Sequence, residues 1–239
     1  MARRRRLQVN GYPMHVVQRG VNRARCFDGA ASNCLYLHIL EEVAALYRCE
    51  VHAYVLMSNH VHLLMTPRTD TGVSLVMKNL GQRYAQGFNR TRSRTGPMWE
   101  GRFHSSIVDS DAYLLRCQRY IELNPVRAAM VEWPEQYPWS SYRANALGQE
   151  SALITPHPVY VALAPNPADR QRAYRRLFAS VPEEELRLIR ESLGRGFPLG
   201  GAEFMESLRV QAGFVAGHRG KRRGRRKAEG PFLHAGKGV

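Results

Sequence analysis

The sequence is poor in cysteine and lacks long apolar runs. Its four cysteines form no Cys-x-x-Cys pair, which disfavours a zinc knuckle or a disulfide scaffold and suits a reducing compartment. No stretch approaches the roughly 18–20 continuous apolar residues of a membrane span, and no apolar segment follows the basic start at 1–10. A GxxxxGK[ST] nucleotide-binding loop is also missing. We therefore expect a cytoplasmic protein, with no membrane partner, whose chemistry needs no nucleotide fuel.

Acidic residues are also scarce beside the basic ones. Lys and Arg number 35 against 20 Asp and Glu, which gives a net charge of +15. So uneven a balance predicts a polyanionic partner. The cations gather at 3–6, along 78–94 and between 219 and 227. The sequence thus predicts a nucleic-acid-binding protein that is associated with the nucleoid.

The apolar pattern predicts an α+β domain over residues 1–148. Runs typical of strands alternate with runs of helical spacing. One strand is expected at 12–20, two strands joined by a Ser-Asn turn at 51–67, and a turn followed by a strand at 96–110. Helices are expected at 34–48, 72–92 and 111–124. Hairpins mixed with helices in this way are typical of an antiparallel sheet with helices packed on it.

Beyond the predicted sheet the pattern changes twice. Residues 137–148 predict a loop that wraps back on the domain through its aromatic side chains. Short helices separated by Pro and Gly predict a helical C-terminal extension over 149–214. The Gly-rich basic tail at 215–239 is expected to stay disordered until it meets an anion.

Two histidines separated by one valine lie within the strand-like run 54–67. Side chains at i and i+2 of a strand point to the same face, so His60 and His62 can hold one metal ion. The alternative is that both are half-buried histidines whose ring nitrogens bind backbone carbonyls. A third metal-binding side chain, and a reaction that a metal ion would assist, are needed to favour the metal site over this alternative.

The helix expected at 111–124 can supply both. Tyr113, Cys117, Tyr120 and Asn124 are spaced four, three and four apart and form one stripe. Glu122 lies about 200° round the helix from Tyr120. The amide oxygen of Asn124 could complete a two-histidine site with the Tyr120 phenol beside it. Such a phenol can attack a DNA phosphodiester and form a resealable phosphotyrosine linkage. Without the two histidines, the expected alternative for Tyr120 is a core tyrosine whose hydroxyl meets water.

Several stretches resemble one family. "NHVHLLMTP" resembles the His-hydrophobic-His (HUH) motif of single-tyrosine transposases, and "RYIELNPVRAAMV" resembles the tyrosine helix of their REP-associated branch. "GQRYAQGFNRTRSRTGPMWEGRFHS", "YPWSSYRA" and "GFPLGGAEF" also resemble stretches of that branch. The resemblance implies a ferredoxin-like core, Mg²⁺ or Mn²⁺ held by His60, His62 and Asn124, and Tyr120 as the nucleophile on single-stranded DNA. It further implies palindromic hairpins as substrate and favours a monomer over a homodimer.

Cations and stacking rings are the means by which proteins hold single-stranded DNA. The predicted DNA contacts are Arg19, Arg83, Arg102, Arg116, Arg119 and Arg127. Three other functions remain open: a nucleic-acid-binding regulator that keeps the fold without chemistry, an HUH nickase, and a metal hydrolase in which water attacks. A covalent DNA adduct on Tyr120 would separate the transposase and the nickase from the other two.

Overall fold

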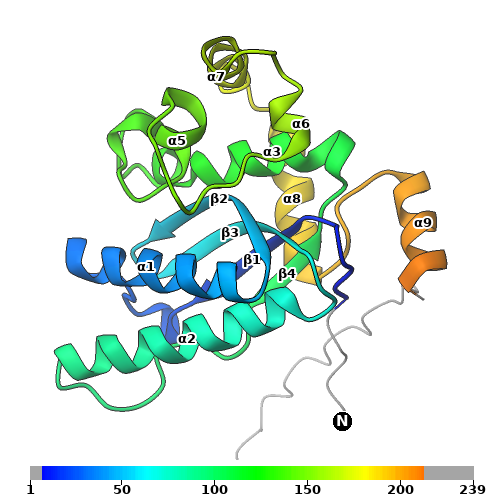
Figure 1. Cartoon of the computed structure of the whole chain (residues 1–239). Coiled ribbons are helices and arrows are strands. Elements are labelled where there is room, and N and C mark those ends of the chain that lie inside the picture. The colour runs from blue at the N-terminus through cyan, green and yellow to red at the C-terminus, as the bar shows by residue number, and fades with distance from the viewer. Residues whose placement is uncertain (1–6, 213–239) are drawn as a thin grey trace, which may run out of the picture.

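A four-stranded antiparallel sheet lies at the centre of the computed structural model, which describes residues 7–212 (Figure 1). Its strands are β1 (Met14–Arg19), β2 (Cys49–Met57), β3 (His60–Pro67) and β4 (His104–Ile107), in the order β2-β3-β1-β4. β1 pairs with β3 on one side and β4 on the other. The basic start at 3–6 and the tail predicted at 215–239 lie outside the described residues.

Helices α1 (Ala30–Leu46) and α2 (Gly72–Thr91) cover one face of the sheet (Figure 1). Apolar side chains from both helices pack there against alternate residues of the strands, with Tyr36 and Tyr84 among the largest fully buried side chains. A short turn, η1 (Val21–Arg23), links β1 to α1. The chain order βαββαβ with this strand order is the ferredoxin-like arrangement, so the predicted fold class is confirmed.

Helix α3 (Ser110–Glu122) covers the opposite face of the sheet. Its residues Leu114 and Ile121 pack against Val55 and Leu64, which project from that face. The helix ends just before Pro125, which lacks a backbone N–H, and a single turn α4 (Asn124–Arg127) follows. The tyrosine helix therefore rests directly on the strand that carries the two histidines.

The C-terminal segment packs on α3 and on the sheet edges. It comprises η2 (Pro134–Gln136), α5 (Tyr142–Leu147), α6 (Pro158–Val161), α7 (Pro167–Arg176), α8 (Glu183–Arg195) and α9 (Ala202–Ala212). Backbone bridges join Val51 to Ile154 and Val108 to Leu199. These contacts join the predicted extension to the sheet, while the boundary at 148 stays a prediction.

The loop predicted at 137–148 is wrong in part, because α5 lies within it. Tyr142 and Ala146, one turn apart, are buried against Tyr160 and Tyr174, which come from much later in the chain. Gly148 ends the helix in the left-handed conformation, with φ of +73°. Within residues 7–212, no helix combines the length and the apolarity that crossing a bilayer requires.

Candidate active site

His60 and His62 lie on the face of β3 that α3 covers. The alternation of β3 places both imidazoles on the same side as Leu64, and their ring centres are 5.0 Å apart. His60 is half-buried at the start of the strand, whereas His62 is buried. The structure therefore brings together the two histidines that the sequence singled out.

The neighbouring turn sets the protonation of His60. Its Nδ1 lies 2.6 Å from Oδ1 of Asn59, and Nδ2 of that amide donates to the carbonyl of Arg23 at 3.3 Å. An amide oxygen only accepts hydrogen bonds, so Nδ1 of His60 carries the proton. Nε2 of His60 therefore keeps a free lone pair.

A third histidine, which the sequence analysis missed, contacts His62. His15 on β1 is completely buried, and its Nε2 lies 2.8 Å from Nδ1 of His62. The two rings stack with centres 5.1 Å apart at 28°. A histidine within the apolar run of β1 was the available signal, but its partner depends on how β1 pairs with β3.

All three imidazoles are neutral near pH 7. Burial lowers the pKa of His15 to about 3. Burial, aided by the charge of Arg19, lowers the pKa of His60 to about 4. Burial also lowers the pKa of His62 well below its usual value, with smaller contributions from the neighbouring histidines. A cation at this site would not have to displace protons from charged imidazoles.

Tyr120 on α3 lies over this histidine row. Its ring centre is 5.9 Å from that of His62 and 5.8 Å from that of His15, with both pairs edge-on at 70°. The guanidinium carbon of Arg127 lies 4.4 Å from the centre of the Tyr120 ring. The Tyr120 phenol, neutral imidazoles and the positively charged Arg127 guanidinium thus meet within a single chain.

Asn124 lies one turn beyond Tyr120 and lines the same cleft. Its Nδ2 donates to the carbonyls of Tyr120 at 2.9 Å and Ile121 at 3.2 Å. These bonds fix the amide, so Oδ1 is the side-chain atom left to bind a ligand. Within residues 7–212, no group of three or more His, Cys, Asp or Glu side chains is arranged to hold a metal ion.

The cleft at the site has a volume of about 460 Å³. Its walls include the two histidines of β3, the tyrosine helix, and Arg19 and Arg102, two of the predicted DNA contacts. The rest of the lining comprises Arg190, Leu193 and Gly194 of α8, together with Val17, Glu100, Gly101 and His104. The sequence analysis missed Arg190, since nothing in the spacing of α8 tells which part of the sheet it covers.

Two more of the predicted DNA contacts lie near the tyrosine. Arg127 is exposed above the Tyr120 ring, as described. Arg116 is exposed one turn before Tyr120, with its guanidinium 5.1 Å from the ring centre of Tyr113 and 3.7 Å from the Glu185 carboxylate. Both could be approached by DNA.

Arg119 is placed differently from the prediction. It is buried, and its guanidinium donates to the carbonyls of Leu177 and Ser180 and to the Glu185 carboxylate at 2.5 Å. The helical rotation between residues 119 and 120 turns this side chain away from the cleft and toward α8. Arg119 therefore anchors the C-terminal helices, and we leave it out of the proposed DNA surface.

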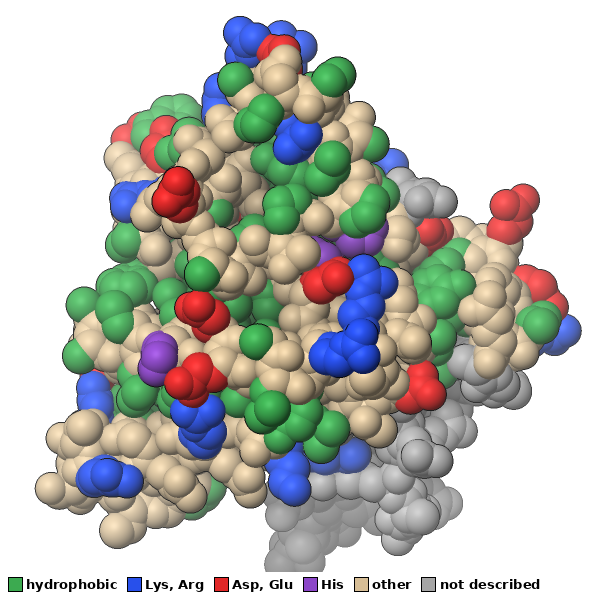
Figure 2. Space-filling view, in the orientation of Figure 1, with side chains coloured by type: hydrophobic (Ala, Val, Ile, Leu, Met, Phe, Trp, Pro, Cys, Tyr) green, Lys and Arg blue, Asp and Glu red, His purple; other side chains and the backbone are tan. Residues whose placement is uncertain are grey.

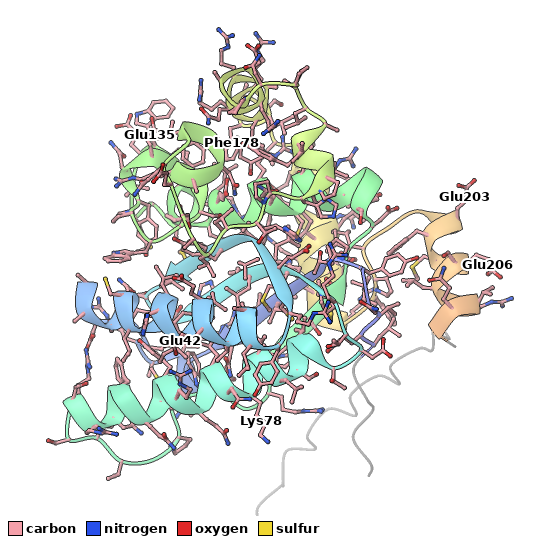
Figure 3. All side chains as sticks on the ribbon, in the orientation of Figure 1. Glu42, Lys78, Glu135, Phe178, Glu203 and Glu206 are labelled. Atoms are coloured by element: carbon pink, nitrogen blue, oxygen red, sulfur yellow. The ribbon has the colours of Figure 1, made fainter. Side chains whose placement is uncertain are left out.

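Arg83 lies on the other face of the sheet. It pairs with Glu42, which Figure 3 labels between α1 and α2. Basic and acidic side chains lie next to one another over these two helices in Figure 2. Because its charge is paired far from Tyr120, we also leave Arg83 out of the proposed surface.

Glu122 faces away from Tyr120, as its helical position predicted. Its buried carboxylate accepts hydrogen bonds from Ser141 at 2.6 Å, Asn145 at 2.8 Å and Tyr174 at 2.8 Å. Burial outweighs these bonds and raises the pKa of Glu122 to about 7. The carboxylate thus joins the tyrosine helix to α5 and α7, and takes no part in the cleft.

Comparison with known proteins places this geometry in context. Residues 8–124 match the family described as "Transposase IS200 like". A Haemophilus influenzae protein described as a REP-associated tyrosine transposase is 27% identical over 109 residues, which cover 41% of this chain and 62% of that relative. A solved REP-associated tyrosine transposase bound to a REP hairpin matches with a TM-score of 0.54 and 17% identity, over 66% of this chain and 93% of that one. At that identity the structural likeness shows the fold alone.

Proposed function

We propose that the protein is a REP-associated tyrosine transposase, from the premise that its residues 8–124 match the family described as "Transposase IS200 like". It would cut and rejoin single-stranded DNA at palindromic hairpins. The observation that carries the proposal is the meeting of the Tyr120 phenol with the His62 and His60 imidazoles in one cleft bordered by arginines.

Tyr120 is the proposed nucleophile. Its Oη attacks the phosphorus of a phosphodiester, so an Oη–P bond forms while the P–O3′ bond breaks. The phenol gives up its proton, and the leaving DNA strand gains one as its 3′-hydroxyl. The Arg127 guanidinium beside the ring would stabilise the negative charge that develops on the phenol oxygen. Attack of a 3′-hydroxyl on the 5′-phosphotyrosine reverses these steps and rejoins DNA without nucleotide fuel.

The donor set fits a divalent cation. His60 and His62 each have one ring nitrogen occupied through Nδ1, and Asn124 keeps its amide oxygen free. Imidazoles alone suit zinc or copper, whereas the amide and phosphate oxygens favour Mg²⁺ or Mn²⁺. When bound, such a cation would polarise a non-bridging phosphate oxygen and offset the charge of the transition state.

Arginines at the cleft are the proposed contacts for the DNA backbone. Arg19, Arg102 and Arg190 line it, and Arg127 on α4 lies against the Tyr120 ring. A hairpin stem could lie on Arg116 and its surroundings, with its single-stranded foot in the cleft. Because one chain supplies every proposed group, we further propose that the protein acts as a monomer. Since its proposed substrate is DNA, we also propose that it works in the cytoplasm at the nucleoid.

A trapping assay tests the proposal. The full chain is incubated with Mn²⁺ and a labelled DNA hairpin that has a single-stranded 5′ extension, and a covalent band is sought after denaturing electrophoresis. The band should form with the wild type and vanish in Tyr120→Phe. The matched control is Tyr113→Phe, two turns earlier on the same helix, which should keep the band. Hairpin binding should survive in both variants, since neither substitution removes a cation.

Each alternative function predicts another result. A regulator without chemistry would bind the hairpin and leave it intact. A hydrolase would cleave it with no covalent band, and a nickase would form the band but fail to rejoin an added 3′-hydroxyl strand. A band that persists in Tyr120→Phe would overturn the assignment of the nucleophile.

A further inference from the structure

We infer that His15 is a positioning residue that holds the His62 ring with Nδ1 protonated and leaves Nε2 as its metal-binding nitrogen. This inference rests on the proposed function, because it concerns the same cation site. His15 is completely buried and does not line the cleft, so it would touch neither DNA nor the cation itself. It would act through the side chain of His62.

The sheet register brings the two rings together. Val17 lies opposite His62 in the pairing of β1 with β3, and His15 lies two residues earlier on the same face of β1. Diagonal neighbours across two strands are within reach of one another when the side chains are long or aromatic. The result is the 2.8 Å contact between Nε2 of His15 and Nδ1 of His62.

The proton in this contact has two possible owners, since both rings are neutral. If Nδ1 of His62 donates, Nε2 of His62 has a free lone pair and His15 carries its proton on Nδ1. If Nε2 of His15 donates, His62 carries its proton on Nε2, and that nitrogen cannot bind a cation. Only the first arrangement makes His62 a ligand through Nε2.

The other nitrogen of His15 is buried and has no hydrogen-bond partner among the described residues. Packing alone would be served better by a leucine, which leaves no polar atom unpaired. The imidazole is therefore best explained by its contact with His62. His60 is oriented in the same manner, since Asn59 accepts from its Nδ1. Each of the two proposed histidine ligands, His60 and His62, thus has a partner at Nδ1, as metal-binding histidines commonly do.

His15 also lies beside the nucleophile. Its ring meets that of Tyr120 edge-on, with centres 5.8 Å apart. One buried side chain therefore packs against both the proposed ligand and the proposed nucleophile. A change at position 15 should alter cation binding first, because the hydrogen bond is to His62.

The test measures Mn²⁺ binding to the full chain without DNA, by electron paramagnetic resonance. His60→Ala and His62→Ala identify the part of the binding that belongs to this site. His15→Leu should weaken that binding by about 10–100-fold, the range for loss of an outer-shell partner. His15→Gln should stay within about threefold of the wild type, because the Gln amide oxygen can accept from Nδ1 of His62.

His52→Gln is the matched control. His52 is also a buried strand histidine, but its partners are Thr66 and Thr155, away from the cleft. This variant should lower the melting temperature and leave Mn²⁺ affinity unchanged. A general loosening of the fold would instead weaken Mn²⁺ binding in both His15→Leu and His52→Gln, which would overturn the inference.

The wild type provides an independent measurement. Long-range ¹H–¹⁵N spectra with Mg²⁺ added should show the His62 proton on Nδ1. A proton on Nε2, or equal Mn²⁺ affinity in the wild type and His15→Leu, would overturn the inference and leave the proposed function standing. Mn²⁺ binding that His62→Ala does not change would overturn the cation site as well. If His15→Leu does not fold, the proton position on His62 in the wild-type spectra and the Mn²⁺ affinity of His15→Gln still test the inference.

Discussion

The neutral state of buried His52 should make the free energy of unfolding depend on pH. His52 lies on β2, where its Nδ1 donates to the carbonyl of Thr155 at 2.7 Å and its Nε2 accepts from the Thr66 hydroxyl at 2.8 Å. A second proton, on Nε2, would place a positive charge in this buried site and require the Thr66 hydroxyl to turn and accept. Burial accordingly lowers the pKa of His52 to about 4, from an ordinary value of 6.5.

The groups that face His52 do not reverse this effect. The His157 ring meets it edge-on, with centres 5.0 Å apart, and disfavours a charge on His52. Glu50 favours the charged form and Arg68 opposes it, and these two side chains form a double hydrogen bond with each other at 2.9 and 2.7 Å. Their opposite charges largely cancel at His52.

The sign and size of the effect follow from linkage. Because the unfolded chain binds a proton more readily than the folded one, the contribution of His52 is complete above pH 6.5 and is lost as the pH falls toward 4. A difference of about 2.5 pKa units corresponds to about 3 kcal/mol in full, and to about 2 kcal/mol of loss at pH 5. The loss comes from the charge that protonation would place in a buried site, since both ring nitrogens of the imidazolium could still donate, to the Thr155 carbonyl and the Thr66 hydroxyl.

Urea unfolding of the wild type and His52→Gln at pH 7.5 and pH 5 measures the effect. The variant should be less stable at pH 7.5, and the gap between the two proteins should narrow by about 2 kcal/mol at pH 5, because glutamine does not titrate. The other buried histidines are present in both proteins, so their contributions to the pH dependence of stability cancel in the difference. An equal gap for His52→Gln at both pH values would refute the reasoning.

Further expected outcomes concern the C-terminal helices and the cation. Arg119→Met should lower the free energy of unfolding in urea by up to roughly 3–5 kcal/mol, because the buried Glu185 carboxylate loses its 2.5 Å partner and keeps only the more distant, exposed Arg116, and adding Glu185→Leu should recover most of the loss. An unchanged free energy of unfolding in Arg119→Met would show that the pair of Arg119 and Glu185 does not anchor α8. Arg190→Ala should reduce the salt dependence of single-stranded DNA binding by about 0.7 log unit in fluorescence anisotropy. Arg187→Ala, on the same helix but outside the cleft lining, should not, and equal slopes in the two variants would exclude α8 as a DNA contact. Chelation of divalent cations should abolish the Tyr120 adduct and leave the circular dichroism spectrum unchanged, because the cores on both faces of the sheet pack apolar side chains. A loss of helical signal would instead make the cation structural.

Local periodicity explains which parts of the site could be predicted. Alternation along a strand places His60 and His62 on one face, and helical spacing places Tyr120 and Asn124 on one stripe with Glu122 behind it. These relations need no knowledge of distant segments. The structure shows each of them.

Residues that depend on distant segments could not be predicted in this way. Arg119 and Arg127 flank the same tyrosine in the sequence, yet only Arg127 lies over its ring, because α8 covers the side of the helix that carries Arg119. Arg190 borders the cleft because of how that same helix packs on the sheet. Pattern along the chain carries no information on such placements.

The sequence by itself determined the order of strands and helices up to the end of the tyrosine helix, the shared face of the two histidines and the stripe of the tyrosine, since each follows from a repeat of two or of 3.6 residues. Only the tertiary structure decided that His15 meets His62, that Glu122 is bound by α5 and α7, and that α8 forms a wall of the cleft. The physical reason is that strand register and helix packing are set by burial of apolar side chains from segments far apart in the chain.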